Sequence, residues 1–439
     1  MIMDRQQEIT LLDAFRKSSG VCTDSRKLFP GCMFFALKGE NFDGNLFAAK
    51  ALEGGAACAV VSSGSGILPG TEGYIVVDDT LEALQALARR HRSSFRIPVI
   101  ALTGTNGKTT TKELLCSVLS ARYNVTATEG NLNNHIGVPL TLLRIDANTE
   151  IAVIEMGANH PGEIALLASI ALPDYGLITN VGKAHLEGFG SFDGVKAAKG
   201  ELYDYLQRTA DTAFCNSDDD TIQSMVSERP DLKTVRYGVR SAGVEILPSS
   251  TEFPFLRLML PDGTEVSTHL IGDYNASNVM AAICVGRHFG IPEADAASAI
   301  SRYVPVNMRS QLKRTGQNLL ILDTYNANPT SMKASLDNFF RSGFEHKAVI
   351  LGDMLELGQD SEYEHSAVLE HLEDADVELK IMVGPRFSSV GNGKENRNTF
   401  FFKDVEEAGK WLEETPLKGF TVLLKGSNGI RLPQLEKLL

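Results

Sequence analysis

The sequence has few cysteines, and they are not arranged to hold a metal or a disulfide framework. The six cysteines are scattered along 439 residues without a Cys-x-x-Cys pair, and the nine histidines form no cluster at zinc spacing. Scattered cysteines of this kind are typical of reduced thiols in a cytoplasmic protein. We therefore predict a cytoplasmic location.

Basic residues and long apolar segments are also scarce. Lysine and arginine number 42 against 55 aspartate and glutamate residues, a formal net charge of −13. Nucleic acid is not expected as a partner, because binding to phosphate backbones needs an excess of basic over acidic residues. The N-terminus has no apolar signal segment, and no apolar run approaches the roughly 20 residues of a spanning helix, so no membrane partner is expected either.

The length and the apolar pattern predict an α/β protein of three domains. A chain of 439 residues exceeds what one hydrophobic core usually supports. We expect a first domain at 1–80, a central domain at 81–304 and a third at 305–439. In the central domain, strands alternate with helices such as 110–121 and 162–170, which indicates a parallel, doubly wound sheet. The predicted strands are 99–103, 151–156 and 175–180 in the central domain, and 319–323, 348–352, 381–384 and 421–426 in the third.

The most informative segment is 99–112, where an apolar strand breaks into a glycine-rich turn. Gly104 and Gly107 would let main-chain N–H groups point at phosphate oxygens. Lys108 adds a positive charge, and Thr109 offers a hydroxyl to Mg²⁺ at the start of a helix. Each of these features matches a nucleoside triphosphate.

The segment departs from the strict Walker spacing, which requires a glycine where this chain has Leu102. The alternative is a chance glycine turn between a strand and a helix. We favour nucleotide binding, because Gly-Lys-Thr follows an apolar strand.

Three further residues are candidates for metal chemistry. Glu155 ends a predicted strand of the same sheet, where its carboxylate could bind Mg²⁺ directly or through water; the alternative is a surface glutamate. His185 follows the next strand and could reach the same metal, although a loop histidine is more often structural. Lys199 flanks the apolar stripe of a predicted helix, and its spacing alone marks it as an ordinary helix lysine.

Two asparagine-rich segments could bind other parts of a ligand. Asn275 and Asn278 lie three residues apart at the start of a predicted helix, so their amides share one face and could match a base edge, or simply cap the helix. The segment that begins at Asp323 holds an acid, a tyrosine and two asparagines just past a strand. It could bind a zwitterionic peptide or a ribose, or form a turn that caps the helix at Met332.

Six motifs along the chain coincide with one known pattern. They are Thr103-Gly-Thr-Asn-Gly-Lys-Thr-Thr, Glu155-Met-Gly, Asn180-Val-Gly-Lys-Ala-His, Ala197-Ala-Lys-Gly-Glu-Leu, Asp273-Tyr-Asn-Ala-Ser-Asn and Asp323-Thr-Tyr-Asn-Ala-Asn-Pro-Thr-Ser-Met. In their order and coverage they resemble the Mur ligase family. The resemblance implies an N-terminal domain that grips a UDP-muramoyl substrate, a central P-loop ATPase-like domain, and a C-terminal Rossmann-like domain that closes over it.

Two stretches are similar to those family members that join D-alanyl-D-alanine to UDP-N-acetylmuramoyl-tripeptide. They are Tyr325-Asn-Ala-Asn-Pro-Thr-Ser-Met and Leu351-Gly-Asp-Met-Leu-Glu-Leu-Gly. The resemblance implies that ATP phosphorylates the tripeptide carboxylate and that the dipeptide amine then attacks the acyl phosphate. The segment Thr23-Asp-Ser-Arg resembles the UDP-sugar domain, but Asn45 stands where the family often has histidine.

The resemblance also implies a role for each candidate residue. Lys108, Glu155, His185 and Lys199 would be catalytic, and the metal ligands would be Thr109, Glu155, His185 and Lys199 as a carbamate. ATP would be bound with Mg²⁺ by Gly104, Thr105, Asn106, Gly107, Lys108, Thr109, Thr110, Asn275, Asn278, Arg309 and Asp323. The uridine nucleotide would contact Ser25 and Arg26, and the dipeptide would contact Asn326, Asn328 and Ser331.

Several alternatives stay open at this point. A ligase that adds the third peptide residue is the nearest, but the Asp-Asn-Pro-Arg motif of its diaminopimelate-adding members is absent. A folylpolyglutamate synthase would lack the N-terminal domain. A small-molecule kinase would use the same phosphate loop, and a regulatory nucleotide-binding module would need no second substrate domain. We expect a monomer whose domains close over the substrates.

Overall fold

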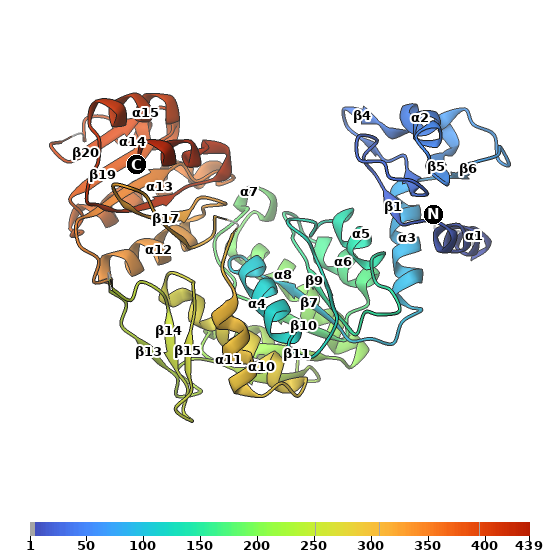
Figure 1. Cartoon of the computed structure of the whole chain (residues 1–439), viewed down its shortest axis with the longest axis horizontal. Coiled ribbons are helices and arrows are strands. Elements are labelled where there is room, and N and C mark those ends of the chain that lie inside the picture. The colour runs from blue at the N-terminus through green and yellow to red at the C-terminus, as the bar shows by residue number, and fades with distance from the viewer. Residues whose placement is uncertain (1–4, 251, 307, 395) are drawn as a thin grey trace.

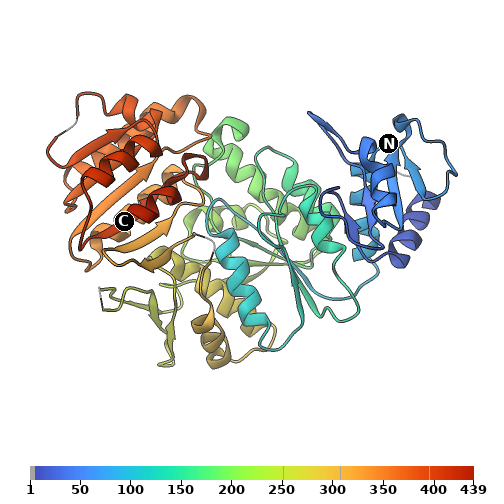
Figure 2. The same cartoon turned by 45° about the horizontal axis from the view of Figure 1, so that its top comes forward.

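The computed structural model describes residues 5–250, 252–306, 308–394 and 396–439, and it contains three α/β units. We call them the N-terminal, central and C-terminal units; their main sheets span 21–77, 99–237 and 311–425. The N-terminal and C-terminal units lie on opposite sides of the central unit in both views (Figures 1 and 2). None of the described helices combines the length and the apolar character needed to cross a membrane.

The N-terminal unit is a parallel sheet of four strands in the order β1-β2-β5-β6. A short hairpin, β3 and β4, leaves one end of it. The strands are β1 (Val21–Cys22), β2 (Met33–Phe35), β3 (Lys38–Gly39), β4 (Phe42–Asp43), β5 (Cys58–Ser62) and β6 (Tyr74–Val77), and the helices are α1 (Arg5–Lys17) and α2 (Ala48–Glu53).

Helix α3 (Thr80–Arg92) connects the first two units. Asp79 caps it by accepting hydrogen bonds from the N–H groups of Leu81 and Glu82 at 2.7 and 2.9 Å. Its apolar face is buried between α1 on one side and helices of the central unit on the other. The domain boundary at residue 80 stays a prediction, because α3 packs against both units.

The central unit is built on a parallel sheet in the order β12-β11-β10-β7-β9-β8. Its strands are β7 (Val99–Thr103), β8 (Val125–Ala127), β9 (Ile151–Glu155), β10 (Tyr175–Ile178), β11 (Thr212–Asn216) and β12 (Lys233–Tyr237). Its helices are α4 (Lys108–Leu119), α5 (Gly137–Leu142), α6 (Glu163–Ala171), α7 (Leu186–Phe189), α8 (Phe192–Thr209), α9 (Asp220–Ser227), α10 (Ala276–His288) and α11 (Glu293–Arg302). The three strands predicted here are confirmed, and β7 and β9 are buried along their whole length.

A small antiparallel sheet in the central unit was not predicted. It comprises β13 (Glu245–Leu247), β14 (Arg257–Met259) and β15 (Glu265–Ser267), paired in that order. Each strand has three residues and is only partly buried. Strands this short give no readable alternation of apolar and polar residues.

The C-terminal unit has a six-stranded sheet in the order β16-β17-β21-β18-β19-β20, in which β16 alone is antiparallel. Its strands are β16 (Gln311–Arg314), β17 (Leu319–Asp323), β18 (Lys347–Gly352), β19 (Leu379–Val383), β20 (Thr399–Phe402) and β21 (Thr421–Lys425). Its helices are α12 (Pro329–Arg341), α13 (Ser361–Glu373), α14 (Pro385–Val390) and α15 (Val405–Glu414). The four predicted strands are confirmed, and separate apolar clusters cover the two faces of this sheet.

Candidate active site

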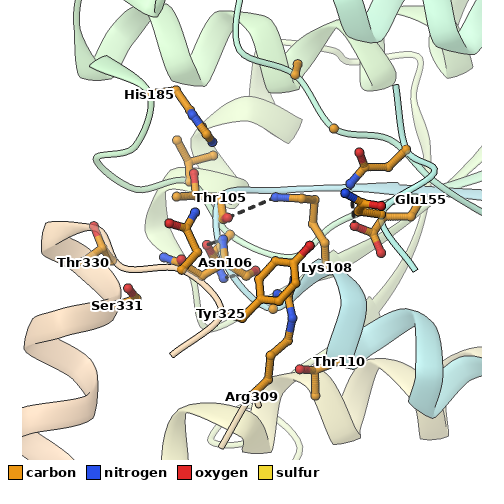
Figure 3. Close-up of a pocket in the computed structure, with 18 of the residues that line it drawn as sticks. Thr105, Asn106, Lys108, Thr110, Glu155, His185, Arg309, Tyr325, Thr330 and Ser331 are labelled. Atoms are coloured by element: carbon orange, nitrogen blue, oxygen red, sulfur yellow. Dashed lines mark hydrogen bonds between the residues drawn. The ribbon is translucent and has the colours of Figure 1, made fainter. Parts of the chain in front are cut away.

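A cavity of about 870 Å³ lies between the central and C-terminal units, beside the loops that follow β7, β10 and β17 (Figure 3). Ligands of open parallel sheets bind at such carboxyl ends. The predicted residues that line it are Thr105, Asn106, Gly107, Lys108, Thr110, Glu155, His185, Asn275, Asn278, Arg309, Asp323, Asn326 and Ser331. Gly104, Thr109, Lys199 and Asn328 are not lining residues, but each contacts a residue that is.

The phosphate loop at 104–107 requires glycine at both ends. Gly104 has φ 146°, and a β-carbon there would lie 2.0 Å from Thr179 Oγ1. Gly107 has φ 78°, and a β-carbon there would lie 2.8 Å from Asn278 Oδ1. The backbone conformation and the space therefore both exclude a side chain.

The loop after β10 holds the phosphate loop in place. Asn106 N donates to Asn180 Oδ1 at 3.0 Å, while Thr179 Oγ1 and Asn180 Nδ2 donate to Asn106 O at 2.6 and 3.0 Å. Thr105 Oγ1 accepts from Gly182 N at 2.9 Å. The main chain of the loop is thus fixed by its own unit, before any ligand binds.

Lys108 folds back over this loop, where Nζ donates to Gly104 O at 2.7 Å and to Thr105 O at 3.1 Å. Burial lowers the pKa of Lys108 to about 8; the charge of Glu155 opposes this shift, and that of Arg309 adds to it. Its hydrogen-bond partners are neutral carbonyls, so the charge is available to an anionic phosphate.

Glu155 is 1% exposed at the end of β9. Its Oε1 accepts from Thr109 Oγ1 at 3.2 Å and from Asn133 Nδ2 at 2.8 Å. In the described part of the chain its Oε2 has no hydrogen-bond donor, and Lys112 Nζ lies 4.0 Å away. A buried carboxylate oxygen that lacks a hydrogen-bond donor among the described residues, beside a threonine hydroxyl, fits the oxygen-donor chemistry of Mg²⁺.

His185 lies across the cavity, with φ 50° at the start of α7. Its Nδ1 is 2.6 Å from Oε2 of Glu356, which belongs to the C-terminal unit. Burial lowers the pKa of His185, and the neighbouring Glu356 charge opposes that shift. In the described ranges, no three His, Cys, Asp or Glu side chains gather at metal-binding distance.

Lys199 is 2% exposed on α8. Its Nζ lies 3.5 Å from Ala158 O and 5.3 Å from the ring centroid of Phe189. Burial is the largest cause that lowers the pKa of Lys199 to about 7. A substantial fraction of this amine is therefore neutral near neutral pH, which spacing along the helix did not predict.

Asn275 and Asn278 line one end of the cavity through a chain of amides. Asn278 Nδ2 donates to Asn275 Oδ1 at 3.0 Å, and Asn278 Oδ1 accepts from Thr111 Oγ1 at 3.1 Å. Asn275 Nδ2 donates to Ile271 O at 2.8 Å. Neither side chain caps α10, so the capping alternative is not supported.

Arg309 and Asp323 reach the cavity from the C-terminal side. The Arg309 guanidinium carbon lies 3.8 Å from the centroid of the Tyr325 ring, as Figure 3 shows. Asp323 pairs with the buried Lys425 at 2.5 Å. Lys425 was not singled out from the sequence, although its position at the carboxyl end of a buried strand was a usable signal.

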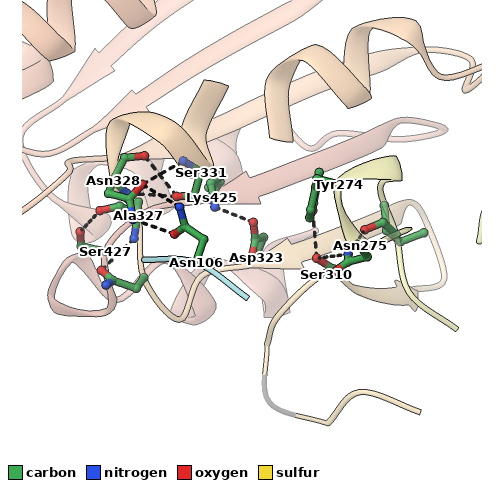
Figure 4. Close-up of polar contacts among 12 residues, drawn as sticks. Asn106, Tyr274, Asn275, Ser310, Asp323, Ala327, Asn328, Ser331, Lys425 and Ser427 are labelled. Carbon is green, nitrogen blue, oxygen red and sulfur yellow. Dashed lines mark hydrogen bonds and ion pairs between the residues drawn. The ribbon is translucent and has the colours of Figure 1, made fainter. Parts of the chain in front are cut away.

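The predicted dipeptide residues divide into two groups. Asn326 and Ser331 line the cavity, whereas Asn328 is buried and caps α12 by accepting from Ser331 N at 2.9 Å. Asn328 Nδ2 donates to Asn106 Oδ1 at 2.8 Å, so its amide faces the phosphate loop (Figure 4).

The predicted uridine contacts lie outside this cavity, in the N-terminal unit. The Arg26 side chain is 86% exposed and pairs with Asp24 at 2.9 Å. Asn45 is structural here: its amide contacts Asp43 and Ser62, and it accepts from Ser62 N at 3.0 Å.

Besides Lys425, two residues of the site were not singled out as candidates from the sequence. Asn133, which orients Glu155, lies in a run of asparagines after β8 that could have been noticed as a polar loop. Glu356 faces His185 from another unit, and no signal in the sequence brings them together.

Three family models match the chain in succession. They are the Mur ligase family catalytic domain at 17–92, the Mur ligase middle domain at 102–286 and the Mur ligase glutamate ligase domain at 308–428.

Curated relatives match over nearly the full length. The UDP-N-acetylmuramoyl-tripeptide--D-alanyl-D-alanine ligase of Bacillus subtilis is 36% identical over 427 residues, which is 95% of this chain and 92% of that protein. The protein of the same name from Escherichia coli is 35% identical over 432 residues, covering 95% and 93%.

Solved structures agree. MurF from Acinetobacter baumannii superposes with a TM-score of 0.85 at 30% identity, covering 98% of this chain and 97% of that one. MurF ligase from Thermotoga maritima, in complex with ADP, gives a TM-score of 0.84 at 26% identity, covering 99% and 98%. With its motifs, its three matched domains and these full-length relatives, the chain belongs to the Mur ligase family.

Proposed function

We propose that this protein is a ligase that uses ATP to join D-alanyl-D-alanine to UDP-N-acetylmuramoyl-tripeptide, with release of ADP and phosphate. The observation that carries the proposal is the single cavity in which the phosphate loop and the loop after β17 meet. The names of the full-length relatives support the substrates, and the ADP complex of the Thermotoga maritima structure supports the nucleotide.

The reaction needs two steps, because a carboxylate and an ammonium do not condense in water. The tripeptide carboxylate attacks the γ-phosphorus of ATP and releases ADP. The dipeptide amine then attacks the acyl carbon, which expels phosphate and loses a proton. Lys108 and Arg309 would balance the charge of the transferring phosphoryl group, which is where electrostatic catalysis contributes most.

The remaining roles are those that the family resemblance implies, for residues of the cavity and for the N-terminal unit. Asn275 and Asn278 would contact the adenine, and Asp323 the ribose or the hinge beside it. Asn326 and Ser331 would contact the dipeptide, and Ser25 and Arg26 would contact the uridine nucleotide in the N-terminal unit. We place the domain boundaries near 80 and 305 and the protein in the cytoplasm.

Mg²⁺ would be held by Thr109 and Glu155, with His185 near by, where it would neutralise phosphate charge. The orphaned Oε2 of Glu155 supports this assignment. A neutral Lys199 amine would react with CO₂, forming a C–N bond and losing a proton, to give a carbamate whose oxygens suit a hard cation. The lowered pKa of Lys199 supports this step.

The function is tested by ATP turnover with each substrate alone and with both together. We expect ADP, phosphate and an amide product in equal amounts only when tripeptide and dipeptide are both present. ADP formation with a single acceptor, accompanied by a stable phosphorylated product, would instead indicate a kinase. Ligation of one amino acid to a shorter UDP-muramoyl peptide would indicate a ligase for the third residue.

A further inference from the structure

The first turn of α12 contacts two loops of the central unit. Thr330 Oγ1 accepts from Lys183 N at 3.1 Å, in the loop after β10. Beside it, Asn328 meets Asn106 in the phosphate loop. Gly182 is so close to this turn that a β-carbon there would lie 2.7 Å from Thr330 Oγ1.

The two asparagine amides form a reciprocal pair. Asn328 Nδ2 donates to Asn106 Oδ1 at 2.8 Å, and Asn106 Nδ2 lies 3.4 Å from Asn328 Oδ1 (Figure 4). Asn328 is 6% exposed, and its Oδ1 also accepts from Ser331 N at the start of α12. The Oδ1 of Asn328 therefore accepts within its own unit and also faces Asn106, while its Nδ2 donates to the other unit.

The main chain and the side chain of Asn106 bond to different units. Its main-chain N–H and carbonyl are bonded to Asn180 and Thr179 of the central unit. Its side chain, in contrast, is bonded to Asn328 of the C-terminal unit. The position of the phosphate loop is thereby linked through one residue to the position of α12.

We propose that the Asn106–Asn328 amide pair couples the phosphate loop to domain closure, and that Asn328 is a positioning residue rather than a dipeptide contact. The pair docks the segment that carries Asn326 and Ser331 against the nucleotide site. This inference rests on the proposed function for its purpose: an acyl phosphate hydrolyses in water, so the dipeptide site must close over the phosphate loop before the amine attacks.

The test uses Asn328→Ser in the full chain. Serine is a good N-cap, so the start of α12 should stay intact, but its side chain is too short to reach Asn106. Asn106→Ser removes the same contact from the other side. Asp404→Ser, which changes the cap of the remote helix α15, is the matched control.

Amide hydrogen exchange of residues 104–112 is measured with saturating Mg-ADP, alongside the KM for the dipeptide. We expect exchange to rise about fivefold in Asn328→Ser, the effect of one neutral hydrogen bond, with α12 still protected and the control unchanged. The double variant should equal each single variant, because all three lose one shared contact. The KM for the dipeptide should rise by a similar factor, with little change in kcat.

Unchanged exchange at 104–112 in Asn328→Ser would overturn the coupling. Additive effects in the double variant would also overturn it, because they would mean that the two amides act separately. The exchange measurement does not depend on turnover, so it tests the coupling separately from the proposed reaction.

Discussion

Two lysines lie at or beside the cavity, the partly buried Lys108 and the fully buried Lys199, and their surroundings differ. Within the described part of the chain, Lys108 donates hydrogen bonds only to carbonyl oxygens of the phosphate loop, at 2.7 and 3.1 Å. Lys199 Nζ lies at the longer distance of 3.5 Å from Ala158 O, with the ring of Phe189 beside it. Burial lowers the pKa of both amines, to about 8 and about 7. The first is suited to bind an anion, and the second to lose its proton.

Replacing Lys108 with alanine should lower turnover by about two to three orders of magnitude without loss of the fold. The ammonium balances charge that develops during phosphoryl transfer, and removal of such a group typically lowers kcat about 10²- to 10³-fold. Burial disfavours the charged form of Lys108, so loss of the ammonium should not lower the thermal midpoint of unfolding. Phosphate release and a melting curve measure the two effects. Near-normal phosphate release would contradict the assignment of Lys108 to the ATP site.

Lys199 predicts a specific dependence of stability on pH. Its pKa falls from 10.5 to about 7 in the folded protein, so between these values the unfolded chain binds more protons than the folded one. The free energy of unfolding in CO₂-free buffer should therefore rise with pH from about 7 to 9. In Lys199→Met this rise should be smaller by the order of 1 kcal/mol.

Urea titrations of both proteins at pH 7 and pH 9 provide the measurement. An equal rise of the free energy of unfolding in both proteins would refute the prediction. Addition of bicarbonate gives a second readout. Wild type should show a carbamate signal with ¹³C-labelled bicarbonate, and Lys199→Met should not. An unmodified, solvent-facing Lys199 in an Mg-ATP complex would argue against the carbamate.

At the scale of elements, the site is made by loops that leave parallel strands. Buried apolar runs such as β7 and β18 were predictable, because a parallel strand covered on both faces is apolar throughout. The strands β13 to β15 were not predictable, because each has three partly buried residues. The loops inherit their positions from the strands, so most site residues could be predicted from strand ends alone.

Gly182→Ala should weaken closure while leaving each unit folded. The new β-carbon would lie 2.7 Å from Thr330 Oγ1 and 3.1 Å from Thr330 Cγ2, and both atoms belong to another unit. Overpacking of this kind costs about 1–3 kcal/mol, so kcat/KM for the dipeptide should fall about tenfold with little change in the melting temperature.

Thr330→Ala in the same chain provides the control. Combined with Gly182→Ala, it removes Oγ1 and Cγ2 of residue 330. The β-carbon of residue 330 still lies 3.1 Å from the β-carbon introduced at residue 182. Partial recovery of kcat/KM is expected. A double variant that is no better than Gly182→Ala would show that the clash is not the cause.

At the scale of the whole molecule, pairs of ionisable side chains also connect the central and C-terminal units. Lys183 Nζ lies 2.8 Å from Glu364 Oε1, and His185 faces Glu356. The Lys183 side chain is 49% exposed and the Glu364 side chain 9%, so water screens the pair from one side and the pair contributes about 1 kcal/mol. The uncharged amides of Asn106 and Asn328, in contrast, are not weakened by salt.

Glu364→Gln should therefore change kcat/KM by less than about fivefold, and the difference from wild type should vanish near 1 M salt. Glutamine keeps the size and one acceptor, so no buried charge is left unpaired. Steady-state rates at low and high salt measure this effect. A large loss that persists in high salt would mean that Glu364 has a role beyond the ion pair.

The sequence by itself determined the α/β class, the phosphate loop and the family, because these depend on local periodicity and on motifs whose spacing is written along the chain. Only the tertiary structure decided which groups face each other across units. It paired His185 with Glu356, gave Lys199 a lowered pKa and turned Asn328 toward Asn106. Burial and contacts between distant segments arise only when the sheets pack, so no pattern along the chain encodes them.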